Sequence, residues 1–157
     1  MRGGATIYQG KLYRETIDNH VVALDMKTGK QVWKQKAAEW KEGYSMTNAP
    51  QIANGVVVTG ISGGEFGIRG FIDGWDPETG KHLWRHYNAP AKGEKGAETW
   101  TGGEPAAGGS SWVTGTYDPE LDLVYWGSCN PSPWNPRGRP GDNLWSNSVI
   151  ALRPKTG

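Results

Sequence analysis

An internal repeat constrains the fold of this chain more than any other feature of its sequence. The stretches VVALDMKTGKQVWKQK (residues 21–36) and FIDGWDPETGKHLWRHY (residues 71–87) each carry a strand-like run, the pattern Asp-x-x-Thr-Gly-Lys, and a Trp three residues later. The equivalent positions are Asp25 and Asp76, Thr28 and Thr79, Gly29 and Gly80, Lys30 and Lys81, and Trp33 and Trp84. A third copy, VIALRPKTG (residues 149–157), has Arg153 in place of Asp. The sequence therefore predicts a fold built from repeated units.

Each copy of the repeat predicts a β-hairpin. The Asp side chain can accept hydrogen bonds from backbone N–H groups two or three residues later, and the Gly supplies the positive φ that a tight turn needs. Further strand-like runs lie at residues 10–16, 55–62 and 117–127, and we interpret the last as a degenerate copy with Asp-Pro at its turn. Units of about 40 to 50 residues with short strands and a fixed Trp are typical of propeller blades. We expect about three to four blades, with Trp33 and Trp84 packed between them.

The composition favours an all-β fold and narrows the possible partners. The 157 residues include 24 glycines, 10 prolines and nine tryptophans, which indicates tight turns and aromatic-packed strands rather than helices. The formal net charge is only +1, which argues against nucleic acid or an anionic membrane surface as a partner. No run is long and apolar enough to predict a membrane span. The single cysteine, Cys129, cannot form an intramolecular disulfide, and we expect it to be a small buried apolar residue.

One stretch, SGGEFGIRG (residues 62–70), places a lone carboxylate, Glu65, among four glycines. By itself such a residue is usually a solvated acid in a turn. The stretch resembles the segment Ser-Gly-[Ala/Gly]-Glu-[Phe/Leu]-Gly-x-Arg-Gly of the pyrroloquinoline quinone (PQQ) dependent alcohol dehydrogenases, the methanol and ethanol dehydrogenase family of eight-bladed β-propellers. The repeat turns resemble the tryptophan-docking motif of the same family. The resemblance covers residues 1–157 and implies that they form part of such a propeller domain.

The resemblance assigns site residues position by position. In the family, the Ser-Gly-small run lies against the quinone and the Glu binds the active-site metal. Two further stretches match, MTNAPQI around Thr47 and SSWVTGTYDPELDLVYWGSCNPSPWN at residues 110–135, and MRGGA retains an Arg that follows the family's vicinal cysteines. The residues implied to contact PQQ are Arg2, Thr47, Ser62, Gly63, Gly64, Ser110 and Trp112, and those implied to bind the metal are Glu65 and Asn130.

These residue types suit the chemistry that the resemblance implies. PQQ is planar and rich in carboxylate and carbonyl oxygens, so a Trp face and backbone without Cβ atoms can lie against it, while hydroxyl and guanidinium groups bind its oxygens. A hard cation such as Ca²⁺, or a lanthanide, takes carboxylate and amide oxygens, here from Glu65 and Asn130. His20, His82 and His86 lack metal-ligand spacing, which argues against zinc. We also expect Arg69 to brace its loop through a salt bridge.

The resemblance implies a periplasmic enzyme that oxidises a primary alcohol to an aldehyde and passes electrons to cytochrome c. It implies that the chain is an internal fragment, truncated at both ends, of a protein that can be a homodimer. The family's vicinal cysteines would precede Met1, and its catalytic base would follow Gly157. We therefore expect the 157 residues alone to be inactive.

Two other functions fit parts of the sequence. A non-catalytic propeller scaffold that binds protein partners would also carry the repeat, but it has no reason to keep Thr47, Ser62, Glu65, Trp112 and Asn130 together. A carbohydrate-binding module would need several Trp rings exposed on one face. The set of five residues favours the enzyme.

Overall fold

A computed structural model describes residues 3–102 and 105–157, and the chain in these ranges is built from short β-strands. The strands are β1 (Ala5–Tyr8), β2 (Lys11–Glu15), β3 (His20–Asp25), β4 (Gln31–Lys36), β5 (Gln51–Ala53), β6 (Val56–Gly60), β7 (Phe71–Trp75), β8 (His82–Tyr87), β9 (Ala107–Gly108), β10 (Thr116–Asp118), β11 (Leu123–Gly127), β12 (Pro131–Ser132) and β13 (Val149–Leu152). The 3₁₀ turns are η1 (Trp40–Glu42), η2 (Gly64–Phe66), η3 (Ala97–Thr99) and η4 (Pro136–Gly138).

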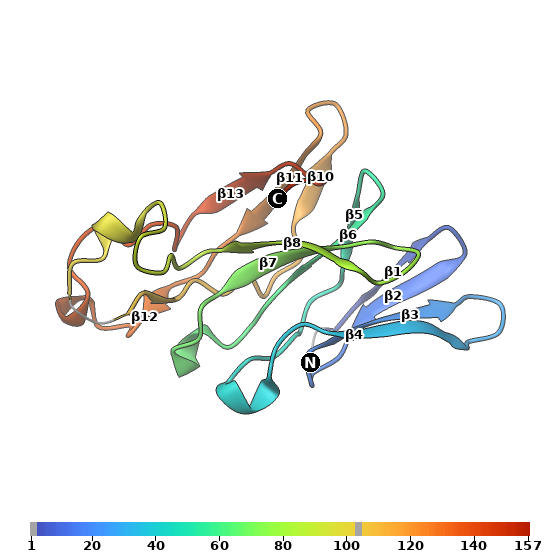
Figure 1. The fold of residues 1–157 in the computed structure, drawn as a ribbon, viewed down its shortest axis with the longest axis horizontal. Helices are drawn as coiled ribbons and strands as arrows, with labels where there is room; N and C mark the ends of the chain where they lie inside the picture. The colour runs from blue at the N-terminus through green and yellow to red at the C-terminus, as the bar shows by residue number, and fades with distance from the viewer. Residues whose placement is uncertain (1–2, 103–104) are drawn as a thin grey trace.

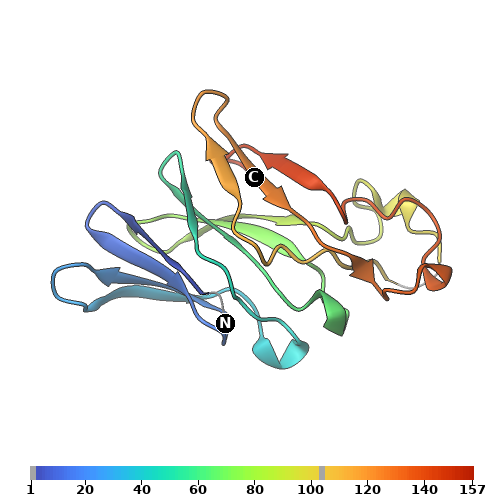
Figure 2. The same cartoon turned by 180° about the vertical axis from the view of Figure 1, so that it is seen from behind.

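The strands form three larger antiparallel sheets that follow one another along the chain (Figures 1 and 2). The first has the order β1-β2-β3-β4, the second β5-β6-β7-β8 and the third β10-β11-β13, while β9 and β12 form a separate two-stranded pair. Strand β5 contacts both β1 and β10, so the first strands of the three sheets lie next to one another. This radial arrangement of consecutive sheets is that of propeller blades, and it confirms the predicted all-β fold.

The inner strands β6 and β7 of the second sheet are buried on both faces, because a neighbouring sheet packs on each side. Side chains alternate between the faces of a strand. In β6, Val57 therefore joins the core shared with the first sheet, which includes Tyr13 and Trp33. Val56 and Val58 join the core shared with the third sheet, which includes Val124 and Trp126 among others. The apolar run of β6 is thus explained by two separate interfaces.

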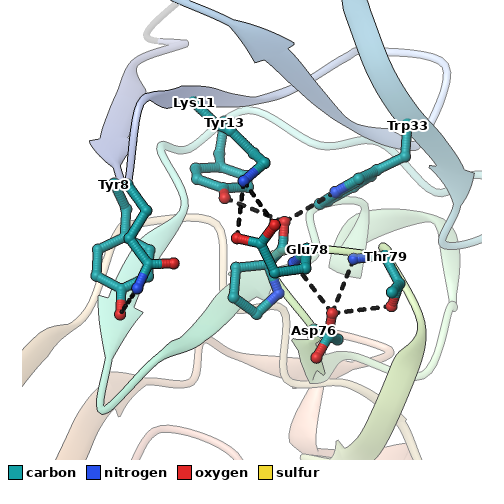
Figure 3. A network of polar contacts seen from close by, with 9 residues as sticks. Tyr8, Lys11, Tyr13, Trp33, Asp76, Glu78 and Thr79 are labelled. Carbon is teal, nitrogen blue, oxygen red and sulfur yellow. Dashed lines mark hydrogen bonds and ion pairs between the residues drawn. The ribbon is translucent and has the colours of Figure 1, made fainter.

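The repeat turns form as predicted, and the turn of the second blade receives Trp33 from the first blade (Figure 3). The Asp76 carboxylate accepts hydrogen bonds from the backbone N–H of Glu78 at 3.0 Å and of Thr79 at 2.8 Å, and Asp25 does the same in its own turn. The Trp33 side chain is 7% exposed and donates its indole N–H to the Pro77 carbonyl at 3.0 Å.

Glycine is needed in these turns because the indole lies directly against the backbone. A Cβ added at Gly80, where φ is +73°, would lie 2.7 Å from the Trp33 ring. The next pair is built in the same way, since the half-buried Trp84 donates its indole N–H to the Pro154 carbonyl at 2.8 Å and lies against Gly157. The prediction that both tryptophans pack between sheets is confirmed.

The stretch at residues 117–127 occupies another place in its blade than the one we predicted. It forms the β10–β11 hairpin, the first of the third sheet, whereas the Asp-x-x-Thr-Gly turns join the third and fourth strands of the first two sheets. The third copy of the turn is instead VIALRPKTG. Its Gly157 N–H donates to the Arg153 carbonyl at 2.8 Å. The equivalent hydrogen bond in the second sheet runs from the Gly80 N–H to the Asp76 carbonyl, at 2.9 Å. The Asp118 side chain caps its own turn through the N–H groups of Glu120 and Leu121, which explains the local similarity.

No helix in the described parts of the chain is long and apolar enough to cross a membrane.

Candidate functional site

The predicted site residues come from four loops at the end of the blades opposite to the repeat turns. Backbone hydrogen bonds join these loops to one another. The segments around Ser45 and Ser62 exchange two backbone hydrogen bonds, of 3.2 and 2.7 Å. The Ser111 N–H donates to the Ile61 carbonyl at 2.8 Å, and the Gly109 N–H donates to the Asn130 carbonyl at 2.8 Å. Residues far apart in the sequence therefore share one surface.

The glycines of the second blade allow these loops to approach closely. A Cβ on Gly60 would overlap with the Ser111 carbonyl oxygen, and a Cβ on Gly70 would overlap with the Gly109 carbonyl. Gly63 has a φ of +111°, and a Cβ there would overlap with a neighbouring backbone carbonyl. A Cβ on Gly64 would lie 2.9 Å from the Ser110 hydroxyl. We expected the glycines to accommodate a flat cofactor, and the structure shows that they let the loops pack closely against one another.

Two adjoining pockets lie on this surface. The larger, of about 500 Å³, is lined by Gly64, Glu65, Ser110, Trp112, Cys129, Asn130, Pro131, Ser132, Pro133 and Trp134. The smaller, of about 330 Å³, is lined by Ser45, Thr47, Ser62, Gly63, Glu65, Phe66, Ser110 and Trp112. Glu65, Ser110 and Trp112 belong to both linings, so the two pockets meet at these side chains. Volumes of this size are typical of small-molecule sites.

The structure brings together all the predicted site residues that it describes. The residues lining one or both pockets are Thr47, Ser62, Gly63, Gly64, Glu65, Ser110, Trp112 and Asn130. The remaining predicted residue, Arg2, lies outside the described residues. Thr47 and Ser62 are joined by a hydrogen bond of 2.7 Å between their hydroxyl groups. The Trp112 side chain is 45% exposed, so one part of its ring is free to contact a ligand.

The pocket offers oxygen ligands of two kinds. Glu65, at the first turn of η2, and Asn130 are both exposed and both line the larger pocket. In the described parts of the chain, no three His, Cys, Asp or Glu side chains come close enough to hold a metal ion. A cation at this site would therefore combine one carboxylate with amide and other neutral oxygens, a set that suits a hard cation.

Cys129 and Trp134 line the larger pocket, although sequence reasoning gave neither a role there. Cys129 is half-buried rather than buried, and its Sγ accepts the indole N–H of Trp112 at 2.9 Å. Trp134 is 78% exposed. The one sequence signal for a role of Trp134 in the pocket was its position within the stretch at residues 110–135 that matches the family.

The prediction that Arg69 braces its loop is confirmed. Its guanidinium forms an ion pair of 2.7 Å with the Glu94 carboxylate and donates to the Ala89 carbonyl at 2.8 Å. It also stacks on the Tyr87 ring at 3.8 Å. Arg69 lines neither of the two pockets.

Comparison with known proteins identifies the family. The model of the PQQ glucose/ethanol/alcohol dehydrogenase beta-propeller domain matches residues 35–157. The chain is 40% identical to the quinohemoprotein alcohol dehydrogenase ADH IIB of Pseudomonas putida over an alignment of 169 residues. This alignment covers 98% of this chain and 24% of the Pseudomonas protein. The chain is 37% identical to methanol dehydrogenase [cytochrome c] subunit 1 of Paracoccus denitrificans, over 93% of this chain and 26% of that one.

The solved structures agree with this assignment. A europium-containing methanol dehydrogenase superposes with a TM-score of 0.89 and 35% identity, over 98% of this chain and 30% of the other. The chain thus spans about a quarter of the length of the curated relatives that it matches. The chain belongs to the family of PQQ-dependent glucose, ethanol and alcohol dehydrogenase β-propellers.

Proposed function

We propose that this chain supplies the quinone-contacting and metal-binding loops of an enzyme that oxidises primary alcohols to aldehydes. The observation that carries the proposal is the convergence of eight predicted residues, from four loops, on two adjoining pockets. The names of relatives further support the reaction class, because they include alcohol and methanol dehydrogenases. We also propose a periplasmic location and cytochrome c as the electron acceptor, and the name of the Paracoccus relative supports the latter.

The residues present fit PQQ and a cation. The half-exposed ring of Trp112 offers a flat apolar surface, and the hydroxyl groups of Thr47, Ser62 and Ser110 can bind quinone oxygens. Glu65 and Asn130 offer the carboxylate and amide oxygens that Ca²⁺ or a lanthanide prefers. The europium in a related methanol dehydrogenase supports the lanthanide as an alternative to calcium. When bound, the quinone serves as the electron acceptor and the cation as a Lewis acid.

The chain's own residues bind and orient in this proposal, and none of them takes the alcohol proton. Glu65 is the one carboxylate among the described residues that line the two pockets, and it is assigned to the metal. We therefore expect the 157 residues by themselves to bind PQQ and metal without oxidising alcohols. Dye reduction by the purified chain with PQQ, Ca²⁺ and ethanol would contradict this part of the proposal.

A terbium titration tests the metal site directly. Terbium(III) is a lanthanide whose luminescence increases near an excited indole, and Trp112 lines the same pocket as Glu65 and Asn130. We expect terbium binding to weaken in Glu65→Gln, because the change removes the anionic ligand, and we expect excess Ca²⁺ to compete. Glu42→Gln is the matched control, since Glu42 is an exposed acid in the first turn of η1 as Glu65 is in η2.

A PQQ titration tests the stacking role of Trp112. We expect Trp112→Ala to weaken PQQ binding by about 1 to 3 kcal/mol, by analogy with bases stacked on aromatic rings. Added metal should restore PQQ binding in Glu65→Gln in part, but not in Trp112→Ala. Equal terbium affinity in Glu65→Gln and the unmodified chain, or an unchanged PQQ affinity in Trp112→Ala, would contradict the proposed site.

A further inference from the structure

The segment 109–112 carries two of the pocket residues, Ser110 and Trp112, yet it belongs to no strand or helix. Irregular backbone that is buried must find hydrogen-bonding partners outside a regular ladder. In this segment Ser110 is 2% exposed and Ser111 is fully buried. The position of the Trp112 ring therefore depends on the side chains that satisfy this backbone.

Ser111 is the centre of the hydrogen bonds that hold the segment. Its carbonyl accepts the side-chain amide of Asn48 and the indole N–H of Trp126, both at 3.2 Å. Its hydroxyl donates to the Gly127 carbonyl at 3.0 Å and accepts the side-chain amide of Asn88 at 2.8 Å. Every polar group of Ser111 is therefore engaged, since its N–H is bound to the Ile61 carbonyl.

Two buried asparagines reach this segment from different loops. Asn48 is 4% exposed and precedes β5, whereas Asn88 is fully buried and follows β8. The Asn88 amide donates a second hydrogen bond, of 2.6 Å, to the Gly109 carbonyl. Asn88 thus holds the segment on both sides of Ser110, and Asn48 holds the residue just before Trp112.

The loop that carries Asn130 holds the same segment from the other side. The Cys129 N–H donates to the Ser110 carbonyl at 2.8 Å, and the Cys129 Sγ accepts the Trp112 indole N–H at 2.9 Å. The direction of the indole N–H fixes the rotation of the ring about its side-chain bonds. Cys129 therefore restrains the ring itself, while the two asparagines restrain its backbone.

We propose that Asn48, Asn88 and Cys129 are positioning residues that orient Trp112 and Ser110 toward the flat ligand of the pocket. This inference rests on the proposed function for the identity of the ligand, and on hydrogen bonds of this structure for the orientation. A merely structural role would require these residues for folding but would leave the Trp112 ring and the ligand affinity unchanged in folded variants.

The test follows the indole N–H resonance of Trp112 by NMR, assigned with Trp112→Phe, and the PQQ affinity by equilibrium dialysis in the presence of Ca²⁺. We expect Asn88→Ala and Asn48→Ala to shift or broaden this resonance and to weaken PQQ binding by about 10- to 100-fold, by analogy with residues that orient the ligands of metal sites. The matched control is Asn143→Ala. Asn143 is 2% exposed, and its side chain contacts Arg139 and Thr99 rather than the segment 109–112.

The half-buried Cys129 supplies variants that keep the core intact. Cys129→Ser retains an acceptor for the indole N–H and should preserve both readouts, whereas Cys129→Ala should change both. The NMR arm needs no ligand, so it tests the positioning role even if the unmodified chain fails to bind PQQ, a result that would contradict the proposed function alone. The inference is overturned if the Trp112 resonance stays unchanged in Cys129→Ala and in folded Asn88→Ala, or if Asn143→Ala changes it equally.

Discussion

Strand β7 connects two parts of its blade that are stabilised by different kinds of hydrogen bond, the repeat turn that follows it and the site loops that precede it. At its C-terminal end, Asp76 binds N–H groups only two and three residues away, and the whole arrangement fits in one short motif. At its N-terminal end, the site loops are joined by hydrogen bonds between residues that are far apart, such as Asn48 and Ser111, 63 residues from each other. Local chemistry therefore forms the turn end, whereas tertiary packing forms the pocket end.

The largest effect should come from the turn end, through the Trp that connects two blades. Trp33→Ala removes a ring that is 7% exposed, and we expect it to lower the free energy of unfolding by about 3 to 5 kcal/mol. Urea denaturation measures the loss. Trp40→Ala is the control, because Trp40 is 55% exposed. Equal losses in the two variants would mean that the contact with the next turn contributes nothing.

The pocket end should be sensitive to a single added methyl group. We expect Gly60→Ala to cost about 1 to 3 kcal/mol, because the new Cβ would overlap with the Ser111 carbonyl. Gly127→Ala is a matched control, since Gly127 also ends a strand but has nothing within 4 Å of an added Cβ. Thermal unfolding of both variants gives the comparison. A Gly60→Ala protein as stable as Gly127→Ala would show that the loops can separate at little cost.

A smaller effect is expected from the Asp side chain of the turn. Asp76→Ala removes the acceptor of two backbone hydrogen bonds and one from the Thr79 hydroxyl, and we expect a loss of about 1 kcal/mol. Hydrogen bonds from Thr79 lower the pKa of Asp76, and the backbone N–H of Thr79 has a larger effect than its hydroxyl. A lowered pKa stabilises the fold above the unfolded-state pKa, and this stabilisation is lost as the pH falls through the folded-state pKa. The difference between Asp76→Ala and the unmodified chain should therefore shrink in acid; a difference independent of pH would contradict this.

The last effect concerns a buried acid at the end of β2, Glu15, and should be visible in the pH dependence of stability. Glu15 is 4% exposed, and neither carboxyl oxygen has a well-formed hydrogen bond among the described residues. Burial raises its pKa well above the ordinary value, and the nearby N–H of Asn48 opposes this rise only in part. A raised pKa means that the unfolded chain releases the proton first. The contribution of Glu15 to stability is therefore fully present below the ordinary pKa of 4.5 and is lost as the pH rises through the folded-state pKa.

Glu15→Gln should flatten this pH dependence, because the amide cannot ionise. Chemical denaturation between pH 4 and 9 compares the two proteins, with Glu42→Gln as a control at an exposed position. Parallel curves for Glu15→Gln and the unmodified chain would show that Glu15 does not ionise on unfolding in this range.

The same contrast explains what the sequence could predict. The Asp-x-x-Thr-Gly turns and the inter-blade packing of Trp33 follow from the chemistry of a few adjacent residues. The site residues were found through resemblance, because Glu65 or Trp112 alone has an ordinary role as turn acid or core aromatic. The misplacement of residues 117–127 has a local cause as well, since Asp118 forms the same kind of side-chain contact in another hairpin.

Sequence reasoning could not have found the residues that support the pocket. Asn88 and Ser111 interact across 23 residues, and a single Asn carries no sign of which distant carbonyl it will bind. Cys129 presented only a small apolar side chain in the sequence, and its contact with Trp112 requires the folded arrangement of two loops. Buried polar contacts of this kind depend on tertiary structure and have no local pattern.

The contact between Trp33 and the turn at Gly80 also bears on how blades can be added by duplication of a repeat unit. It is a heterologous contact: one unit contributes an outer-strand indole and the next contributes a turn, and Trp84 and Gly157 repeat the relation in the same direction. A duplicated unit therefore carries both complementary surfaces and can be inserted between two others without any new interface. The motif fixes the order and polarity of the blades but not their number, which must follow from the wedge angle between adjacent sheets.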